Sequence, residues 1–145
     1  MAHLTAPDIA TMAPEARALL INSLPGYKSA MLVGTCDAAG QTNLAIVSSH
    51  FHLGSSPPLL AMILRPSTGN SERHTLHNLL ETRCWTLNGF SLDNAAQAHQ
   101  TSAPYPKTQS EFDACDFEAE WLAEFGAPFI RGSSLQVGCF LREHH

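Results

Sequence analysis

Two short polar segments carry the side chains best suited to binding a planar or phosphorylated ligand. The first, residues 42–51 (TNLAIVSSHF), places Asn43, Ser48 and Ser49 among small apolar residues. A strand of this composition can offer backbone N–H groups and hydroxyls to a planar polar ligand. An ordinary strand with a polar end remains the alternative.

The second segment, residues 65–75 (RPSTGNSERHT), places two arginines, several hydroxyls and a glycine between an expected strand and an expected helix. The start of a helix favours phosphate because its free N–H groups and its dipole point at the anion. Arginine adds a bidentate fork. The alternative is a capped helix, with Thr68 or Ser71 as the N-cap.

Other kinds of chemistry have little support in the sequence. A third polar segment, residues 98–105 (AHQTSAPY), is typical of a loop. The chain has no G-x-S-x-G, no paired-carboxylate motif and no G-x-G-x-x-G, which disfavours a hydrolase triad, a glycosidase and a Rossmann dinucleotide site. Its eight histidines never adopt H-E-x-x-H spacing, so no metal site is expected. The scattered cysteines are expected to be free thiols: Cys36, Cys84, Cys115 and Cys139.

The composition and the first residues indicate which partners and which cellular compartment to expect. The 145 residues carry a net charge of −5 without a basic block, which disfavours nucleic acid and anionic membranes as partners. No apolar stretch approaches the roughly 18 residues of a membrane-spanning helix. The first residues lack the cationic start and apolar core of a signal peptide, so we expect a cytoplasmic protein.

The elements that must position these segments are mainly strands. The hydrophobic pattern predicts one domain over residues 1–145, a small antiparallel barrel with peripheral helices. A turn at residues 37–40 joins the first two strands as a hairpin, and residues 101–115 form a loop. Strands are expected at residues 29–36, 41–48, 59–64, 84–88 and 134–141, and helices at 8–22, 72–81, 92–99 and 118–125.

Five strands close a barrel poorly, and the last expected strand has no strand after it to pair with. An unpaired edge exposes backbone hydrogen-bonding groups. Either another chain covers this edge, or the sequence lacks a C-terminal part of the domain.

Several motifs in order resemble the flavin reductase-like family, which has an FMN-binding split barrel. The resemblance extends over about residues 24–142. The order and spacing of the motifs together are more specific than any one of them. They are MLVGT (31–35), GQTNLA (40–45), SSHF (48–51), PPLL (57–60), RHTLHNL (73–79), HQTSAPYP (99–106), EFDAC (111–115) and SLQVGC (134–139).

The resemblance implies a Greek-key antiparallel split barrel and a homodimer with FMN near the subunit interface. On the isoalloxazine side it implies contacts from Asn43, Ala45, Ser48 and Ser49. For the phosphate and ribityl chain it implies contacts from Arg65, Ser67, Arg73 and Thr75. The chain departs from the family pattern at Ile46, where proline is common, and at His74, where aspartate is common. Relatives also continue through further strands, so the last part of the barrel is expected to be missing here.

The function that the resemblance implies is an FMN-dependent oxidoreductase, a flavin reductase that takes hydride from NAD(P)H. FMN carries the hydride chemistry, so the protein needs to supply only orientation and electrostatics, and no catalytic side chain is expected. Two alternatives stay open. One is a non-catalytic protein that binds flavin or another small ligand, and the other is a pyridoxamine-phosphate oxidase-like enzyme.

Overall fold

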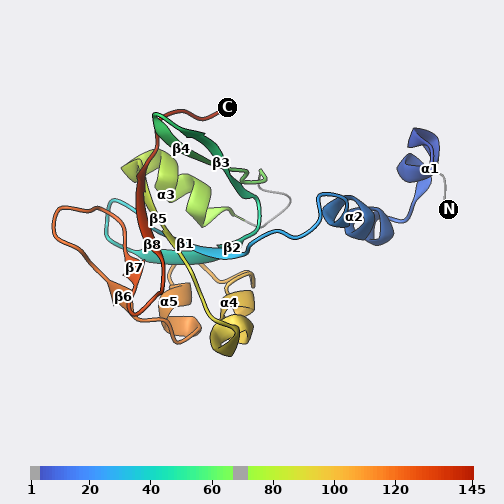
Figure 1. The fold of residues 1–145 in the computed structure, drawn as a ribbon. Helices are drawn as coiled ribbons and strands as arrows, with labels where there is room; N and C mark the ends of the chain where they lie inside the picture. The colour runs from blue at the N-terminus through green and yellow to red at the C-terminus, as the bar shows by residue number, and fades with distance from the viewer. Residues whose placement is uncertain (1–3, 67–71) are drawn as a thin grey trace.

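The computed structural model describes residues 4–66 and 72–145. Its sheets are antiparallel and its helices lie around them (Figure 1). The elements in chain order are α1 (Ala6–Thr11), α2 (Pro14–Ser23), β1 (Met31–Cys36), β2 (Thr42–Val47), β3 (His50–Ser55), β4 (Pro58–Met62), α3 (His74–Thr82), β5 (Cys84–Asn88), a 3-10 turn (Leu92–Asn94), α4 (Ala95–Gln100), α5 (Glu111–Ala114), β6 (Ala119–Glu120), β7 (Phe129–Ile130) and β8 (Gln136–Phe140).

The main sheet has four strands in the order β2-β1-β5-β8. Every residue of β1 (MLVGTC) is buried, as expected of a central apolar strand covered on both faces. The turn to β2 is fixed by Asp37, whose Oδ1 accepts from the amides of Ala39 (3.0 Å) and Gln41 (2.9 Å). The turn predicted at residues 37–40 is present, and Gly40 takes a positive φ of 84° in it, which glycine adopts without strain.

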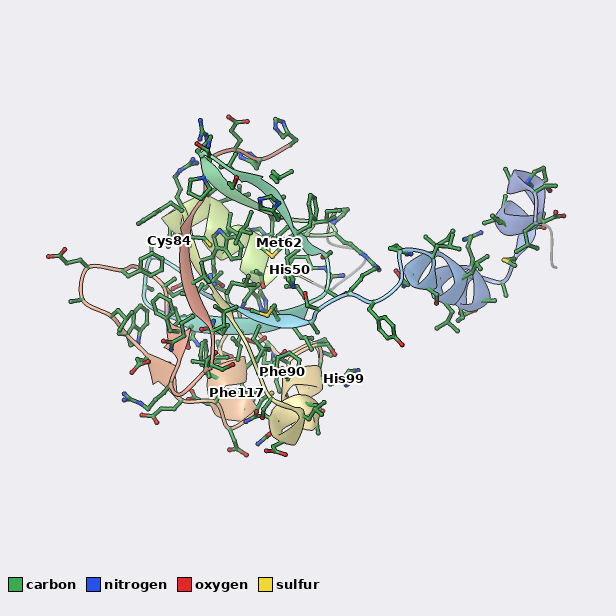
Figure 2. The ribbon with its side chains drawn as sticks, viewed as in Figure 1. His50, Met62, Cys84, Phe90, His99 and Phe117 are labelled. Carbon is green, nitrogen blue, oxygen red and sulfur yellow. The ribbon has the colours of Figure 1, made fainter. Side chains whose placement is uncertain are left out.

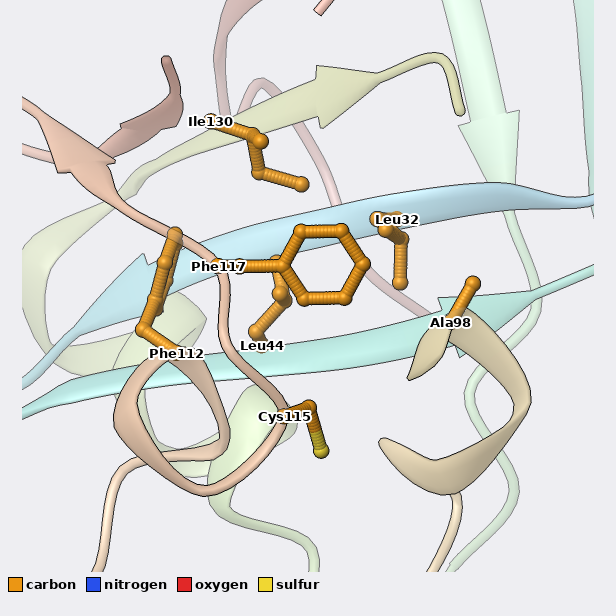
Figure 3. Packing of buried hydrophobic residues seen from close by; sticks show 7 residues of the cluster. All are labelled: Leu32, Leu44, Ala98, Phe112, Cys115, Phe117 and Ile130. Carbon is orange, nitrogen blue, oxygen red and sulfur yellow. The ribbon is translucent and has the colours of Figure 1, made fainter. Parts of the chain in front are cut away.

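A separate apolar cluster lies on each face of the main sheet. On one face, α3 packs over Val33, Trp85 and Leu87, and Met62 of β4 joins this cluster. Figure 2 shows Met62 on this side of the sheet and Phe117 on the opposite side. On the other face the cluster includes residues of α4, α5 and β7 (Figure 3). It consists of Leu32, Leu44, Ala98, Phe112, Cys115, Phe117 and Ile130. The sheet is therefore the middle layer of the body.

Buried polar groups fix the segment that leads into β7 against the second face. The hydroxyl of Thr86 donates to the carbonyl of Pro128 (2.6 Å), and Oδ1 of Asn88 accepts from the amide of Ile130 (3.1 Å). The backbone approaches so closely that a Cβ on Gly34 would lie 2.4 Å from the Pro128 carbonyl oxygen. Position 34 therefore has room only for glycine.

The N-terminal helices stand apart from this body. Figure 1 shows α1 and α2 projecting to one side on the segment that leads into β1, and neither helix has a buried residue. The prediction of one helix over residues 8–22 is wrong in one respect. The helix is divided at Met12 and Ala13, both in extended backbone, because the residue before Pro14 is disfavoured in the helical region.

Three further element predictions are wrong. Strand β3 was not expected, residues 111–114 form α5 within the predicted loop, and residues 118–125 are not a helix. Ala119 and Glu120 instead pair with Ile130 and Phe129 as β6 and β7. Tertiary pairing thus overrides the local helix preference of EAEWLAEF.

The expectation of a mainly β domain with peripheral helices is confirmed, but closure of the barrel is not. Over the described residues the strands form three separate sheets, of four, two and two strands. Strands β2 and β8 are the edges of the main sheet and do not pair with each other. Within the same residues no helix is long and apolar enough to cross a membrane. All four cysteines are free thiols, as the sequence predicts.

Candidate functional site

The N-cap residue of helix α3 is exposed. Its N-cap is Arg73, no side chain in the described part of the chain caps it, and its first turn holds no acidic residue. The first amides of a helix have no partner within the helix and carry the positive end of its dipole. Arg73 therefore adds an exposed positive charge at this end of the helix. The caps considered from the sequence, Thr68 and Ser71, lie outside the described residues.

A buried polar network joins the first turn of α3 to the main sheet. Nδ2 of Asn43 donates to the hydroxyl oxygens of Thr75 (3.0 Å) and Thr35 (3.2 Å). Nδ2 of Asn78, one turn further along α3, also donates to Thr35 (3.2 Å). Oδ1 of Asn78 is buried and has no hydrogen-bond partner among the residues that the structure describes. The network fixes the height and rotation of α3 above β1 and β2.

The structure thus brings two of the predicted site residues together, but their side-chain groups face each other. Asn43 and Thr75 are 6% and 8% exposed, and the Thr75 hydroxyl is already an acceptor for Asn43. Their side chains bind each other between the main sheet and the first turn of α3. The amide of Thr75 lies in the first turn, where it has no helical partner.

The other predicted residues that the structure describes are half-buried or exposed. Ala45 is half-buried on β2, and Ser48 is exposed just after that strand. Ser49 is half-buried, and its hydroxyl donates to the carbonyl of Ile63 (2.7 Å) while its own carbonyl accepts from the Ile63 amide (2.9 Å). Arg65 is exposed after β4, and Ser67 lies outside the described residues.

Side chains from two helical regions protect the outer edge of β2. Oε2 of Glu111 accepts from the amide of Leu44 (3.0 Å), and the hydroxyl oxygen of Thr101 accepts from the amide of Ile46 (2.9 Å). These amides alternate along the strand and point away from β1, as in any antiparallel edge. Sequence reasoning missed the role of Glu111. The EFDAC motif marks the residue, but its partner is 67 positions away.

Glu111 also lines a small polar pocket between β2, α3 and the loop before α5. The pocket has room for about one water molecule (about 10 Å³), and its other lining residues are Gln41, Thr42, Asn43, His74, Asn78, Lys107 and Gln109. Burial raises the pKa of the Glu111 carboxyl, while the Leu44 amide opposes that rise. The lining is therefore a set of donors and acceptors from three elements that meet at the start of α3.

A second pocket, of about 170 Å³, continues along the exposed side of α3. It is lined by Glu72, His74, His77, Glu81 and Lys107. Lys107 pairs with Asp37 (3.0 Å). The backbone N–H of Gln41 and, after it, Lys107 hold the pKa of Asp37 below its usual value. In the described residues no group of three or more histidine, cysteine or acidic side chains could hold a metal ion.

The family profile described as "flavin reductase like domain" matches residues 24–145. The chain belongs to the flavin reductase-like family. The resemblance found in the sequence motifs is therefore confirmed. The match also supports the expectation that the protein is a flavin-related oxidoreductase. No curated protein matches the chain.

Among solved structures, a protein assigned as a flavin reductase with a split barrel domain, from Shewanella frigidimarina, is 43% identical. The similarity covers 100% of this chain and 71% of that one, with a TM-score of 0.91. Component B of nitrilotriacetate monooxygenase from Bacillus cereus is 16% identical over 99% of this chain and 69% of that one (TM-score 0.85).

An FMN-binding protein from Thermus thermophilus is 18% identical over 81% of this chain and 61% of its own (TM-score 0.66). The Bacillus and Thermus proteins share the fold at low identity. The Shewanella protein is assigned a split barrel domain, whereas the described strands of this chain form three separate sheets that do not close a barrel.

Proposed function

We propose that this protein is an FMN-binding oxidoreductase that takes hydride from NADH or NADPH, a flavin reductase. The observation that carries the proposal is the match of the flavin reductase-like family over residues 24–145. The 43% identical protein from Shewanella frigidimarina, assigned as a flavin reductase, supports the same activity.

The FMN phosphate binds at the start of α3 in this proposal. The end of the helix is uncapped in the described residues, and Arg73 stands directly beside it. Backbone amides of the first turn, including that of Thr75, can donate to the phosphate, and Arg73 and Arg65 add full positive charge. Ser67 belongs to the proposed set through the family resemblance alone, because it lies outside the described residues.

The isoalloxazine ring lies along the end of β2. Glu111 and Thr101 already occupy the outward amides of Leu44 and Ile46. The polar groups proposed to meet the ring therefore lie just after the strand, at the exposed Ser48 and at the hydroxyl oxygen of Ser49, which donates to Ile63 and can still accept a hydrogen bond. Ala45 offers a small half-buried side chain against which a planar ring can pack. Asn43 does not contact the ring in this proposal; its hydrogen bond to Thr75 holds the start of α3 against β2.

The chain's own residues bind and orient in this mechanism. FMN, when bound, supplies the hydride-transfer chemistry. Arg73 and the α3 amides fix the phosphate end, while Ser48 and Ser49 orient the polar edge of the ring. The side of the ring away from β2 must stay open for a nicotinamide to stack on it.

The proposed assembly is a homodimer. The β3–β4 hairpin beside the candidate ring site exposes Phe51, Leu53 and Leu60. Exposed apolar residues that gather on one element are typical of an interaction surface. A twofold dimer would cover them, since closed C2 pairs are the commonest soluble assemblies. Light scattering that gives a dimer mass for the purified protein would support this arrangement, and a monomer mass would contradict it.

One pair of assays separates the proposed function from its alternatives. FMN binding is measured by quenching of flavin fluorescence, and NADH and NADPH oxidation is followed with FMN present. Binding together with nicotinamide oxidation supports the flavin reductase. Binding without oxidation favours a flavin carrier, and turnover of pyridoxamine phosphate instead favours the oxidase-like enzyme.

A further inference from the structure

We propose that Glu111 is a positioning residue for the candidate flavin site. Its carboxylate accepts a hydrogen bond from Leu44 of β2, next to Asn43, the residue that binds the first turn of α3. This inference rests on the flavin binding proposed above, and it assigns a role to a side chain that contacts neither the ring nor the phosphate.

The first step is the attachment of α5 to β2. Glu111 is 6% exposed, and its Oε2 accepts from the Leu44 amide at 3.0 Å. The hydroxyl groups of Ser110 and Thr42 lie 2.7 Å apart in a second hydrogen bond, two residues before Leu44 on the strand. Ser110 also caps α5 by accepting from the amide of Phe112 (3.2 Å). The start of α5 is therefore fixed to two neighbouring points of β2.

The second step leads from β2 to α3. Asn43 lies between those two points, and successive side chains of a strand point to opposite faces of the sheet. The side chain of Leu44 enters the cluster on the α5 face, whereas Asn43 points to the α3 face and binds Thr75. A movement of β2 at Leu44 would therefore also move Asn43, which donates a hydrogen bond to Thr75 in the first turn of α3.

The third step is a comparison with Thr101, which performs the same task on the next outward amide. Thr101 accepts from Ile46 with a neutral hydroxyl, which is the less costly group to bury. The other titratable side chains that line the small polar pocket with Glu111 are His74 on α3 and Lys107 in the loop before α5. Glu111 therefore accepts from β2 and also lines the pocket at the start of α3. Thr101 accepts from β2 but does not line this pocket.

The experiment compares FMN affinity among variants of the full chain. Glu111→Leu removes the acceptor, Glu111→Gln keeps an oxygen for the Leu44 amide, and Thr101→Val removes the matched acceptor on the same strand edge. Dissociation constants for FMN are measured well below the unfolding temperature. Hydrogen exchange of the Leu44 amide is recorded for each variant without flavin.

We expect Glu111→Leu to weaken FMN binding roughly tenfold, the lower end for one lost hydrogen bond to a charged group. Its Leu44 amide should exchange faster. Glu111→Gln should restore both quantities to near the wild-type values, and Thr101→Val should leave FMN affinity within about twofold. Where Glu111→Leu does not fold, Glu111→Asp replaces it, because the shorter carboxylate keeps the charge but withdraws from Leu44.

Two results would overturn the inference, and they are distinguishable. If the wild type binds no FMN, the proposed function fails and this inference fails with it. If the wild type binds FMN and the folded Glu111→Leu or Glu111→Asp protein binds it equally well, only the positioning role is excluded. An equal loss in Thr101→Val would also exclude it, since the effect would then belong to the strand edge in general.

Discussion

Nδ2 of Asn43 donates a 3.0 Å hydrogen bond to the hydroxyl of Thr75, which joins β2 to the first turn of α3. The two residues are 32 positions apart, and both are buried. The contact fixes the end of α3 proposed to bind the phosphate relative to the strand proposed to carry the flavin ring. A bond between two side chains thus sets the distance between the two halves of the candidate site.

The first prediction concerns that bond. Thr75→Val removes the hydroxyl oxygen but keeps the shape of the side chain, so Asn43 loses one of its two acceptors. We expect the free energy of unfolding to fall by about 1–3 kcal/mol, the cost of leaving a buried polar group short of a partner. Urea unfolding monitored by circular dichroism measures this. Thr108→Val, at an exposed position, is the control and should change stability by less than about 0.5 kcal/mol.

The second prediction concerns Gly34. An added Cβ would lie 2.4 Å from the Pro128 carbonyl oxygen and 2.5 Å from the Thr86 hydroxyl, so Gly34→Ala must push the segment before β7 off the sheet. We expect a loss of at least about 1–3 kcal/mol of stability, the usual cost of overpacking a core. Thermal unfolding compares it with Gly54→Ala, whose Cβ would make only an ordinary 3.5 Å contact. Equal unfolding temperatures for the two variants would show that the segment yields freely.

The third prediction concerns pH. Burial is the main cause that raises the pKa of Glu111 above its usual value of 4.5. The folded protein therefore holds this proton to higher pH than the unfolded chain does. By linkage, Glu111 makes stability fall as pH rises from about 4.5 through the folded-state pKa. In this range the contribution of Asp37, whose pKa is lowered from 3.8, is already complete and stays constant.

Glu111→Gln should remove that fall, so the difference in stability between variant and wild type should shift in favour of the variant as pH increases. The measurement is urea unfolding at several pH values from 4.5 to 8. Glu15→Gln, on the exposed helix α2, is the control and should parallel the wild type. If stability plotted against pH for Glu111→Gln also parallels the wild type, the Glu111 carboxyl has the same pKa in the folded and unfolded states, which would contradict the prediction.

The sequence predicted the centre of the fold better than its periphery. The strands β1, β2 and β5 follow from apolar runs and from a turn closed by Asp37 and Gly40, all of which are local signals. Strand β3 (HFHLGS) was missed because it is mostly exposed and, within the described residues, has β4 as its single partner strand. Residues 118–125 favour a helix locally, but β7 pairs with Ala119 and Glu120, and Arg131 forms ion pairs with Glu118 (2.7 Å) and Glu120 (3.5 Å).

For the candidate site, the sequence identified the segments but not the orientation of their side chains. The position of Arg73 at the start of α3 follows from the local pattern and is found in the structure. The burial of Thr75 could not be predicted, because it depends on Asn43 in a distant strand. Glu111 was missed for the same reason, since its partner Leu44 is known only when the chain is folded.

The fourth prediction separates a phosphate contact from a structural role at Arg73. Arg73→Ala should weaken FMN binding about 10- to 150-fold, as one charge-assisted hydrogen bond is worth roughly 1.5–3 kcal/mol. Riboflavin lacks the phosphate, so it should bind the wild type more weakly and be nearly indifferent to the substitution. Fluorescence titration of both flavins measures this, with Arg142→Ala, another exposed arginine, as the control. Equal losses for FMN and riboflavin would assign Arg73 to the fold alone.

The central claim is that this chain binds FMN and lets a nicotinamide nucleotide reduce it. The most direct measurement is anaerobic mixing of the FMN-loaded protein with NADH and, separately, NADPH, while the visible absorbance band of oxidised flavin is recorded. We predict that one nucleotide bleaches the band at a rate that saturates with its concentration and far exceeds the rate with free FMN. A bound flavin whose band neither nucleotide bleaches faster than free FMN would contradict the claim.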